Sequence, residues 1–200
     1  MMDVKPNGFL SRYILALMLL EVQGNPVILG PLYPNCKNDV SNTKDLSKLS
    51  EKETTDLLEV YSKYHGSFSD STPKDVPDPA VSGDNFPAKL LNIYSKDELF
   101  SLHILKVEEY QEELGGNYQD LKKNLSQVKV ELPRLVLKLT EILKGLDPNT
   151  PLPPKPEPLK LNHDNDYDKQ KYGWQVINTL KSWLSQVVQA LEEGEKECDG

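Results

Sequence analysis

The stretch Tyr167–Leu191, YDKQKYGWQVINTLKSWLSQVVQAL, decides the fold. Its apolar residues recur at steps of three, four and one, which is the spacing of one face of an α-helix. The face consists of Ile177, Leu180, Leu184, Val187, Val188 and Leu191, and Tyr172, Val176 and Trp183 widen it. Asn165 or Asp166 is expected to cap the start, and Gly194 to end the helix. A helix of about 25 residues is about 37 Å long, so covering this face requires partner helices of similar length.

Two segments before this stretch are expected to supply partner helices. Residues 41–65 form the first, which ends at Gly66. Its inner face consists of Leu46, Leu49, Leu57, Val60, Tyr61 and Tyr64. The second helix begins at the capping box Ser95-Lys96-Asp97-Glu98, in which Ser95 and Glu98 each accept a backbone N–H of the other. It ends at Gly115-Gly116.

Residues 117–146 carry the longest apolar pattern and are expected to form the third helix, with Asn117 as its cap. Its face consists of Tyr118, Leu121, Leu125, Val128, Leu132, Leu135, Leu139, Ile142, Leu143 and Leu146. Pro133 falls inside this pattern, where proline removes one backbone hydrogen bond. We therefore expect a kink at Pro133 rather than an end.

The connections between the helices predict the topology. Helices two and three are separated by two or three residues, so they must run antiparallel. The other two connections have about 20 residues each, enough to span a helix about 40 Å long. The sequence therefore predicts an all-α fold, an up-up-down-down four-helix bundle with two long crossover loops.

The N-terminus has the pattern of a secretory signal peptide. Lys5 and Arg12 precede the short apolar run Tyr13–Leu20, and cleavage is expected after Gly24. We therefore assign residues 1–24 to a signal peptide, 25–37 to an irregular lead-in, 38–194 to the bundle and 195–200 to a C-terminal tail. The mature chain is expected to be secreted, extracellular and monomeric, and no later run reaches the ~20 apolar residues of a membrane span.

Charge and cysteine content restrict the possible partners. The chain of 200 residues has a net charge of −8, which disfavours binding to the phosphates of nucleic acids. Cys36 and Cys198 are the only cysteines. In an oxidising compartment they could form a disulfide within the chain, remain as two thiols, or pair between chains.

Three short motifs resemble the long-chain helical cytokines of the interleukin-6 family, in the group of leukaemia inhibitory factor, ciliary neurotrophic factor and the cardiotrophins. Tyr61–Gly66 resembles the end of the family's first helix, Ser95–Leu99 the start of the second, and Gly173–Val188 the fourth helix with its tryptophan. The resemblance implies a secreted ligand that crosslinks receptor chains of the leukaemia inhibitory factor receptor and glycoprotein 130 type and thereby activates kinase–STAT signalling.

The resemblance also implies receptor-binding residues. Tyr167 and Gln170 match a Phe and a Lys by which family members bind the leukaemia inhibitory factor receptor, and Lys169 and Lys171 flank the position that lacks the charge. Leu90 matches a Trp that precedes the second helix in members that use an alpha receptor. Because leucine lacks the indole, use of an alpha receptor is not expected. A third family surface lies on helices one and three, where the candidates are Lys48, Lys52, Lys122 and Lys129.

Motifs for catalysis, metal binding or cofactors do not stand out, so we expect neither an enzyme nor a bound cofactor. His65, His103 and His163 lack partners at the spacing of a catalytic triad. His163–Asp166 lacks the glycine and glutamate of a calcium loop, and its simpler role is to cap the fourth helix. Asn124-Leu125-Ser126 is a glycosylation acceptor. The alternative to a cytokine is a secreted helical carrier that encloses an apolar small molecule.

Overall fold

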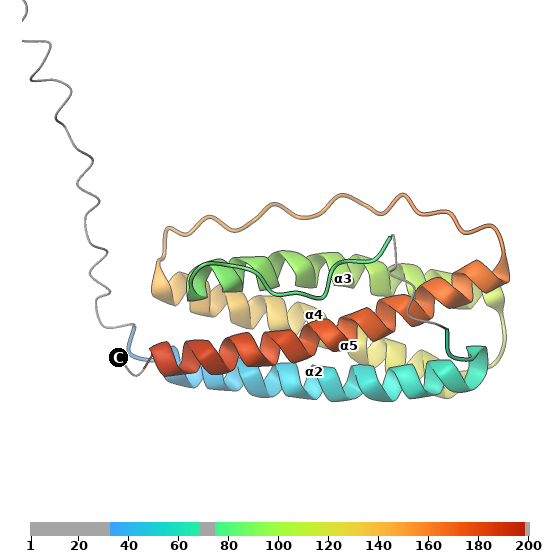
Figure 1. Cartoon of the computed structure of the whole chain (residues 1–200), viewed down its shortest axis with the longest axis horizontal. Coiled ribbons are helices and arrows are strands. Elements are labelled where there is room, and N and C mark those ends of the chain that lie inside the picture. Colours follow the sequence, from blue (N-terminus) through green and yellow to red (C-terminus); the bar gives the residue numbers. More distant parts are fainter. Residues whose placement is uncertain (1–32, 69–74, 199–200) are drawn as a thin grey trace, which may run out of the picture. The chain divides into compact units, whose positions relative to one another are not determined.

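This computed structural model describes residues 33–68 and 75–198, which contain four helices and their connections. The helices are α2 (Cys36–His65), α3 (Phe86–Leu114), α4 (Gln119–Leu146) and α5 (Asp166–Glu197). α2 and α3 each pack against both α4 and α5 (Figure 1). No strand occurs among the described residues. The predicted all-helical class and the four-helix bundle are thus confirmed, and the proposed signal peptide lies outside the described residues.

Helix α5 carries the face predicted for it. Its start is capped by Asn165, whose Oδ1 accepts the backbone N–H of Asp168 at 2.9 Å. The nine predicted face residues are all buried, namely Tyr172, Val176, Ile177, Leu180, Trp183, Leu184, Val187, Val188 and Leu191. The predicted end at Gly194 is wrong, because the helix continues to Glu197. Gly194 instead makes room for the ring of Phe86, whose Cε2 would lie 2.0 Å from a Cβ at this position.

Helix α2 begins at Cys36, inside the stretch predicted to be irregular. Its buried residues follow steps of four and three along the whole helix: Cys36, Val40, Thr43, Ser47, Ser50, Thr54, Leu57 and Tyr61. Leu49, predicted to face inward, is 45% exposed. The sequence interpretation failed here because it sought apolar residues, whereas the centre of this face is built from serine and threonine.

The buried hydroxyls of α2 are satisfied within their own helix. Those of Thr43, Ser47, Ser50 and Thr54 donate to the carbonyl four residues earlier, at 2.6, 2.8, 3.0 and 2.8 Å respectively. A buried hydroxyl is costly only when it lacks a hydrogen bond. These small side chains therefore leave space beside α2 for larger residues of the partner helices.

Helix α3 begins nine residues before the predicted capping box, at Phe86. Asn85 is the true cap, and its Oδ1 accepts the backbone N–H of Ala88 at 2.9 Å. Ser95 lies inside the helix and donates its hydroxyl to the carbonyl of Leu91 at 3.0 Å. The capping box is thus wrong, because a Ser followed by an acid three residues later also occurs within helices.

Helix α4 agrees with its predicted face and continues through Pro133. Eight of the ten predicted residues are buried, and Tyr118 and Leu146 at its two ends are half-buried. Asn117 is not the cap, since the N-cap position is Tyr118 and no side chain there accepts a helix N–H.

A disulfide between Cys36 and Cys198 joins the start of α2 to the end of α5. Of the states that the sequence left open, the structure therefore has the bond within the chain. Lys44 and Glu195 form an ion pair beside it. All of these residues belong to the compact unit of residues 31–200. None of the described helices has an apolar stretch sufficient to span a lipid bilayer.

One carboxyl group is buried in the core without a partner. Asp97 of α3 has no exposed surface, and neither of its carboxyl oxygens has a hydrogen-bond partner. Burial, and to a smaller extent the charge of Glu98, raises the pKa of Asp97 well above its ordinary value.

We expect Asp97→Asn to stabilise the protein at alkaline pH. A carboxyl whose pKa is raised by folding contributes stability at low pH and loses it as the pH rises. The free energy of unfolding of the wild type should therefore fall relative to that of the variant between pH 4 and pH 8. Urea titrations of both proteins across this range measure the difference, and parallel pH profiles would contradict it.

Candidate functional site

The start of α5 presents an exposed aromatic side chain next to the end of α2. Tyr167 is 61% exposed, and its ring meets the ring of Phe68 edge to face at a centroid distance of 5.6 Å. Phe68 also lies 6.3 Å from the ring of Trp174, which is nearly buried. The Trp174 Nε1–H donates to the Ser62 hydroxyl at 3.2 Å. Tyr167 therefore projects from an aromatic base that ties α5 to α2.

Gln170 and Lys171 lie on the same side of α5 as Tyr167, three and four residues further along the helix. Both are half-buried. The Gln170 backbone carbonyl accepts the hydroxyl of Tyr61 at 3.1 Å, which fixes this turn of α5 to α2. We call the group of Tyr167, Gln170 and Lys171 the Tyr167 surface.

Gly173 allows α2 to approach α5 closely under the Tyr167 surface. A Cβ at Gly173 would lie 2.1 Å from the hydroxyl oxygen of Tyr61. Tyr61 is fully buried, and its hydroxyl also accepts the Nε2–H of Gln111 at 3.2 Å. Burial raises the pKa of Tyr61, so its hydroxyl stays protonated and can donate to Gln170.

Lys169 points away from the Tyr167 surface and toward α3. Its ammonium pairs with Glu113 at 2.6 Å and lies 5.7 Å from the centre of the Tyr110 ring. The hydrogen bond with Glu113 raises the pKa of Lys169 and lowers that of Glu113. The cation expected to replace the missing charge at Gln170 is thus engaged within the bundle, and Lys171 is the lysine that shares a side with Tyr167.

Leu90, the candidate position for an alpha receptor, does not lie on the surface. It is fully buried and sits in the second turn of α3, rather than ahead of the helix. Because α3 starts earlier than predicted, the position falls on the inner side of the helix. Leu90 is therefore a core residue.

Exposed apolar residues on α2 and α4 were missed by the sequence interpretation. Val130 and Leu137 of α4 are 52% and 64% exposed and lie seven residues apart, on one side of the helix. We call these two residues the α4 apolar surface. Leu49 of α2 is the third such residue. The spacing of Val130 and Leu137 could have been recognised in the sequence, because these two residues lie opposite the regular core face of α4.

The lysines considered for the same helices mostly pair with carboxylates. Lys48 lies 3.7 Å from Glu192, Lys52 3.4 Å from Asp56 and Lys129 2.6 Å from Glu108, whereas Lys122 is exposed. Exposed pairs of this kind contribute little to stability. Asn124, the glycosylation acceptor, is half-buried on α4 beside the core residue Leu125.

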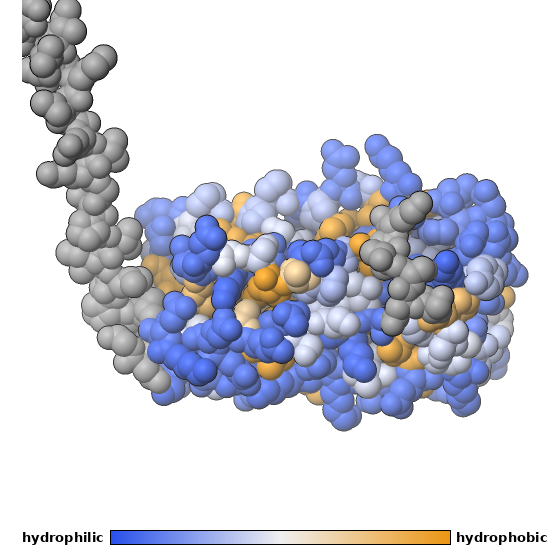
Figure 2. All heavy atoms as spheres, viewed as in Figure 1, coloured by the Kyte–Doolittle hydropathy of each residue, from blue (hydrophilic) through white to orange (hydrophobic). Residues whose placement is uncertain are grey.

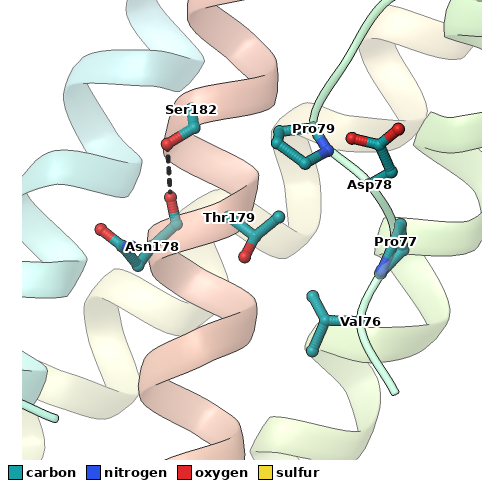
Figure 3. A pocket seen from close by; sticks show the side chains of 7 residues that line it. All are labelled: Val76, Pro77, Asp78, Pro79, Asn178, Thr179 and Ser182. Atoms are coloured by element: carbon teal, nitrogen blue, oxygen red, sulfur yellow. Dashed lines mark hydrogen bonds between the residues drawn. The ribbon is translucent and has the colours of Figure 1, made fainter. Parts of the chain in front are cut away.

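A groove lies between α5 and the connection that precedes α3. Its volume is about 380 Å³, and its walls are Val76, Pro77, Asp78, Pro79, Asn178, Thr179 and Ser182 (Figure 3). Figure 3 shows Thr179 facing Val76 and Pro79 across the groove. The α5 side of the groove is polar, and the Ser182 hydroxyl donates to the Asn178 carbonyl at 3.1 Å. The opposite side is apolar at Val76, Pro77 and Pro79, so the groove is apolar on one side only and open to solvent, unlike a cavity that encloses a lipophilic ligand.

The polar character extends to the rest of the visible surface. On the face drawn in Figure 2, hydrophilic residues cover most of the area and hydrophobic residues form small separate spots. Within the described residues no group of three His, Cys, Asp or Glu side chains is arranged to hold a metal ion. The exposed features available to a partner on the described part of the chain are thus side chains such as those of the Tyr167 surface and the α4 apolar surface.

Comparisons with known proteins do not assign the chain to a family. No protein-family model matches it, and no curated protein sequence is significantly similar to it.

Proposed function

We propose that the protein is a secreted helical cytokine of the interleukin-6 type that binds and crosslinks cell-surface receptor chains. The observation that carries the proposal is an exposed aromatic side chain, Tyr167, held on a rigid turn at the start of the last helix of a four-helix bundle. Rigid aromatic anchors next to polar groups dominate the binding energy of many protein interfaces.

The order of the helices supports an up-up-down-down arrangement with two long crossover connections. The Cys36–Cys198 disulfide brings the start of α2 to the end of α5, and the Lys89–Glu193 pair at 2.6 Å does the same for α3. At the opposite end, Tyr64 of α2 donates to Asp120 of α4 at 2.7 Å. Residues 147–165 run alongside the helices in Figure 1. This arrangement is that of growth hormone and cytokine bundles.

Two separate surfaces on one bundle support a crosslinking role. The Tyr167 surface lies at the start of α5, and the α4 apolar surface lies on the outer side of α4, where the family resemblance also places a receptor contact. The protein would act by geometry alone: it holds two receptor ectodomains so that their cytoplasmic kinases meet and activate STAT proteins. Once one receptor is bound, the second binds at a raised effective concentration.

Secretion is part of the proposal. It rests on the signal-like pattern of residues 1–24 and agrees with the intrachain disulfide, since disulfides persist in oxidising compartments. The expected partners are ectodomains of the leukaemia inhibitory factor receptor type and of the shared chain glycoprotein 130.

Binding to purified receptor ectodomains tests the proposal directly. Each ectodomain is immobilised alone and in combination, and the affinity of the full disulfide-bonded chain is measured. We expect binding to at least one chain alone and tighter binding to the pair. Absence of binding to every ectodomain and to their pairs would refute the proposed function.

Tyr167→Ala is expected to weaken receptor binding by about 2 kcal/mol, or roughly thirtyfold, the loss typical of an interface hot spot. Because Tyr167 is exposed, the melting temperature and the circular dichroism should not change. Leu137→Ala is the matched control for the other surface, since it removes an exposed side chain far along another helix. A receptor that loses affinity equally with both variants would show that Tyr167 does not form a distinct contact.

A further inference from the structure

Four aromatic and imidazole rings meet on the α3 side of the start of α5. His103 and Tyr110 come from α3, Tyr172 from α5, and His163 from the connection between α4 and α5. We call them the tyrosine–histidine cluster. His103 Nδ1 and the Tyr172 hydroxyl are 2.7 Å apart, and His163 Nδ1 and the Tyr110 hydroxyl are 3.0 Å apart. The cluster thus joins three segments through two histidine–tyrosine hydrogen bonds.

The rings also pack against one another. The rings of His163 and Tyr172 are 4.9 Å apart, and Tyr110 lies 5.7 Å from Tyr172 in an edge-to-face arrangement. The backbone N–H of His163 donates to the Tyr110 hydroxyl at 3.3 Å. These contacts fix the last residues of the α4–α5 connection against α3.

The charged groups around the cluster are two lysines, their glutamate partners and Asp75. Lys106 of α3 lies 4.5 Å and Lys169 of α5 lies 5.7 Å from the centre of the Tyr110 ring, and each pairs with a glutamate on α3. Asp75, ahead of α3, is the acid whose charge acts on His103. The Tyr172 hydroxyl, which contacts His103, is neutral, since burial raises the pKa of Tyr172. The charge of Asp75 favours a protonated His103, but the cost of burying that charge is larger.

Burial makes the uptake of a proton by His103 unfavourable in the folded state. The side chain is 4% exposed, and its removal from water lowers its pKa from 6.5 to about 4. A histidine with a lowered pKa stabilises the fold above pH 6.5, and this stability is lost as the pH falls toward 4. Opening of the cluster releases His103 to water and is favoured over that range.

The third histidine of the chain lies at the same end of the bundle but acts less directly. His65 Nε2 and Gln111 Oε1 are 2.7 Å apart, and burial lowers the pKa of His65. Since the Gln111 oxygen is an acceptor, His65 must donate, and this bond persists when the imidazole is charged. Protonation therefore weakens the hydrogen bond of His65 less than it weakens the hydrogen bond of His103.

We propose that the tyrosine–histidine cluster is an acid-sensitive latch, which holds residues 161–165 and the first two turns of α5 against α3 at neutral pH and releases them when His103 takes up a proton. The far ends of α2 and α5 remain joined by the Cys36–Cys198 disulfide, so release is confined to one end of the bundle. The released segment carries Tyr167. The latch operates whatever binds at Tyr167, because its release is measured on the free chain.

Hydrogen exchange of the full disulfide-bonded chain at pH 7 and pH 5, corrected for intrinsic exchange rates, tests the latch. The His103 imidazole has a pKa of 6.5 in the opened form and about 4 in the closed form. This difference makes opening about 20-fold more favourable at pH 5 than at pH 7. We expect this increase in peptides that cover residues 161–173 and no change in peptides that cover residues 184–197. A uniform increase over all four helices would overturn the proposal.

His103→Asn is the decisive variant, because the asparagine amide can occupy the place of Nδ1 but does not titrate. The acid response should fall from about 20-fold to less than about threefold. His65→Gln is the matched control and should retain the response of the wild type. Persistence of the full response in His103→Asn would overturn the proposal.

A measurement on the wild type covers the case in which His103→Asn fails to fold. The ring carbon signals of the three histidines are followed by NMR as the pH is lowered. A midpoint for His103 well below 6.5, with exchange of Tyr172 signals in the same range, would support the latch. A midpoint at 6.5 with no effect on Tyr172 would overturn it.

Discussion

Replacement of both cysteines, Cys36→Ala with Cys198→Ala, is expected to lower the free energy of unfolding by about 4–5 kcal/mol. The disulfide spans a sequence separation of 162 residues, and in the chain-entropy model a loop of this length loses most of its freedom in the unfolded state. Domains of this kind are typically stable by only about 5–15 kcal/mol. The variant should therefore unfold at a much lower urea concentration.

The loss of stability should arise from the greater conformational freedom of the unfolded state. In the folded state, other contacts hold the same end of the bundle together. Lys44 pairs with Glu195 there, and Lys89 pairs with Glu193 at 2.6 Å. The Phe86 ring fills the space that Gly194 leaves. The double variant should accordingly keep the circular dichroism of the wild type at low urea.

The wild type in a reducing agent is the control for this prediction. Its urea midpoint should fall to that of the double variant, since both lack the cross-link. If the double variant had the urea midpoint of the oxidised wild type, the cross-link would not contribute to stability. The packing of the α2 and α5 ends alone would then determine the stability of this end of the bundle.

The helices with regular apolar faces could be predicted from the sequence. In α4 and α5 the spacing of leucine, valine and isoleucine identified the buried side, because burial of apolar area is the main term that fixes a helix face. The interior glycine of α5 was misread as an end. Gly194 is needed for the Phe86 ring, and contacts between distant residues leave no local signal.

The hydroxyl face of α2 could not be predicted by hydrophobicity. Thr43, Ser47, Ser50 and Thr54 are buried because each hydroxyl is satisfied inside the helix, which removes most of the cost of burial. Leu49, by contrast, remains exposed. The sequence shows which residues of α2 are polar enough to be exposed to solvent. Which of them are buried depends on how α4 and α5 pack against α2.

The candidate site could be predicted in part. The position of Tyr167 in the first turn of α5 followed from the capping residue Asn165. The partners that define the site, such as Tyr61 for Gln170 and Glu113 for Lys169, are separated from it by tens of residues in the sequence. Lys169 is therefore not part of the Tyr167 surface, because it pairs with a carboxylate of another helix. Leu90 is a core residue, because α3 starts earlier than predicted.

Trp183→Ala is expected to be the most destabilising single substitution in α5, with a loss of about 3–5 kcal/mol. Trp183 is fully buried at the centre of the bundle, and its ring lies 5.1 Å from the ring of Phe100 on α3. Removal of the indole would leave a cavity between α3 and α5 that the surrounding side chains fill only in part. Urea unfolding measures the loss.

Trp183→Phe separates the contribution of ring volume from that of the indole N–H. The Nε1–H is buried without a hydrogen-bond partner, so its removal relieves an unpaired donor while the phenyl ring fills part of the space. We expect this variant to lose less than about half of what Trp183→Ala loses. An equal loss would show that the indole N–H makes a hydrogen bond essential to the fold.

Comparison of Trp183→Ala with Tyr167→Ala distinguishes the core of α5 from its proposed receptor contact. Both substitutions remove an aromatic side chain from the same helix, one fully buried and the other 61% exposed. Trp183→Ala should lower stability, and the protein that remains folded should bind receptor normally. Tyr167→Ala should stay within about 0.5 kcal/mol of the wild type in stability and lose receptor affinity. If the two variants behaved alike in both measurements, the start of α5 would be part of the packed core rather than a surface for a partner.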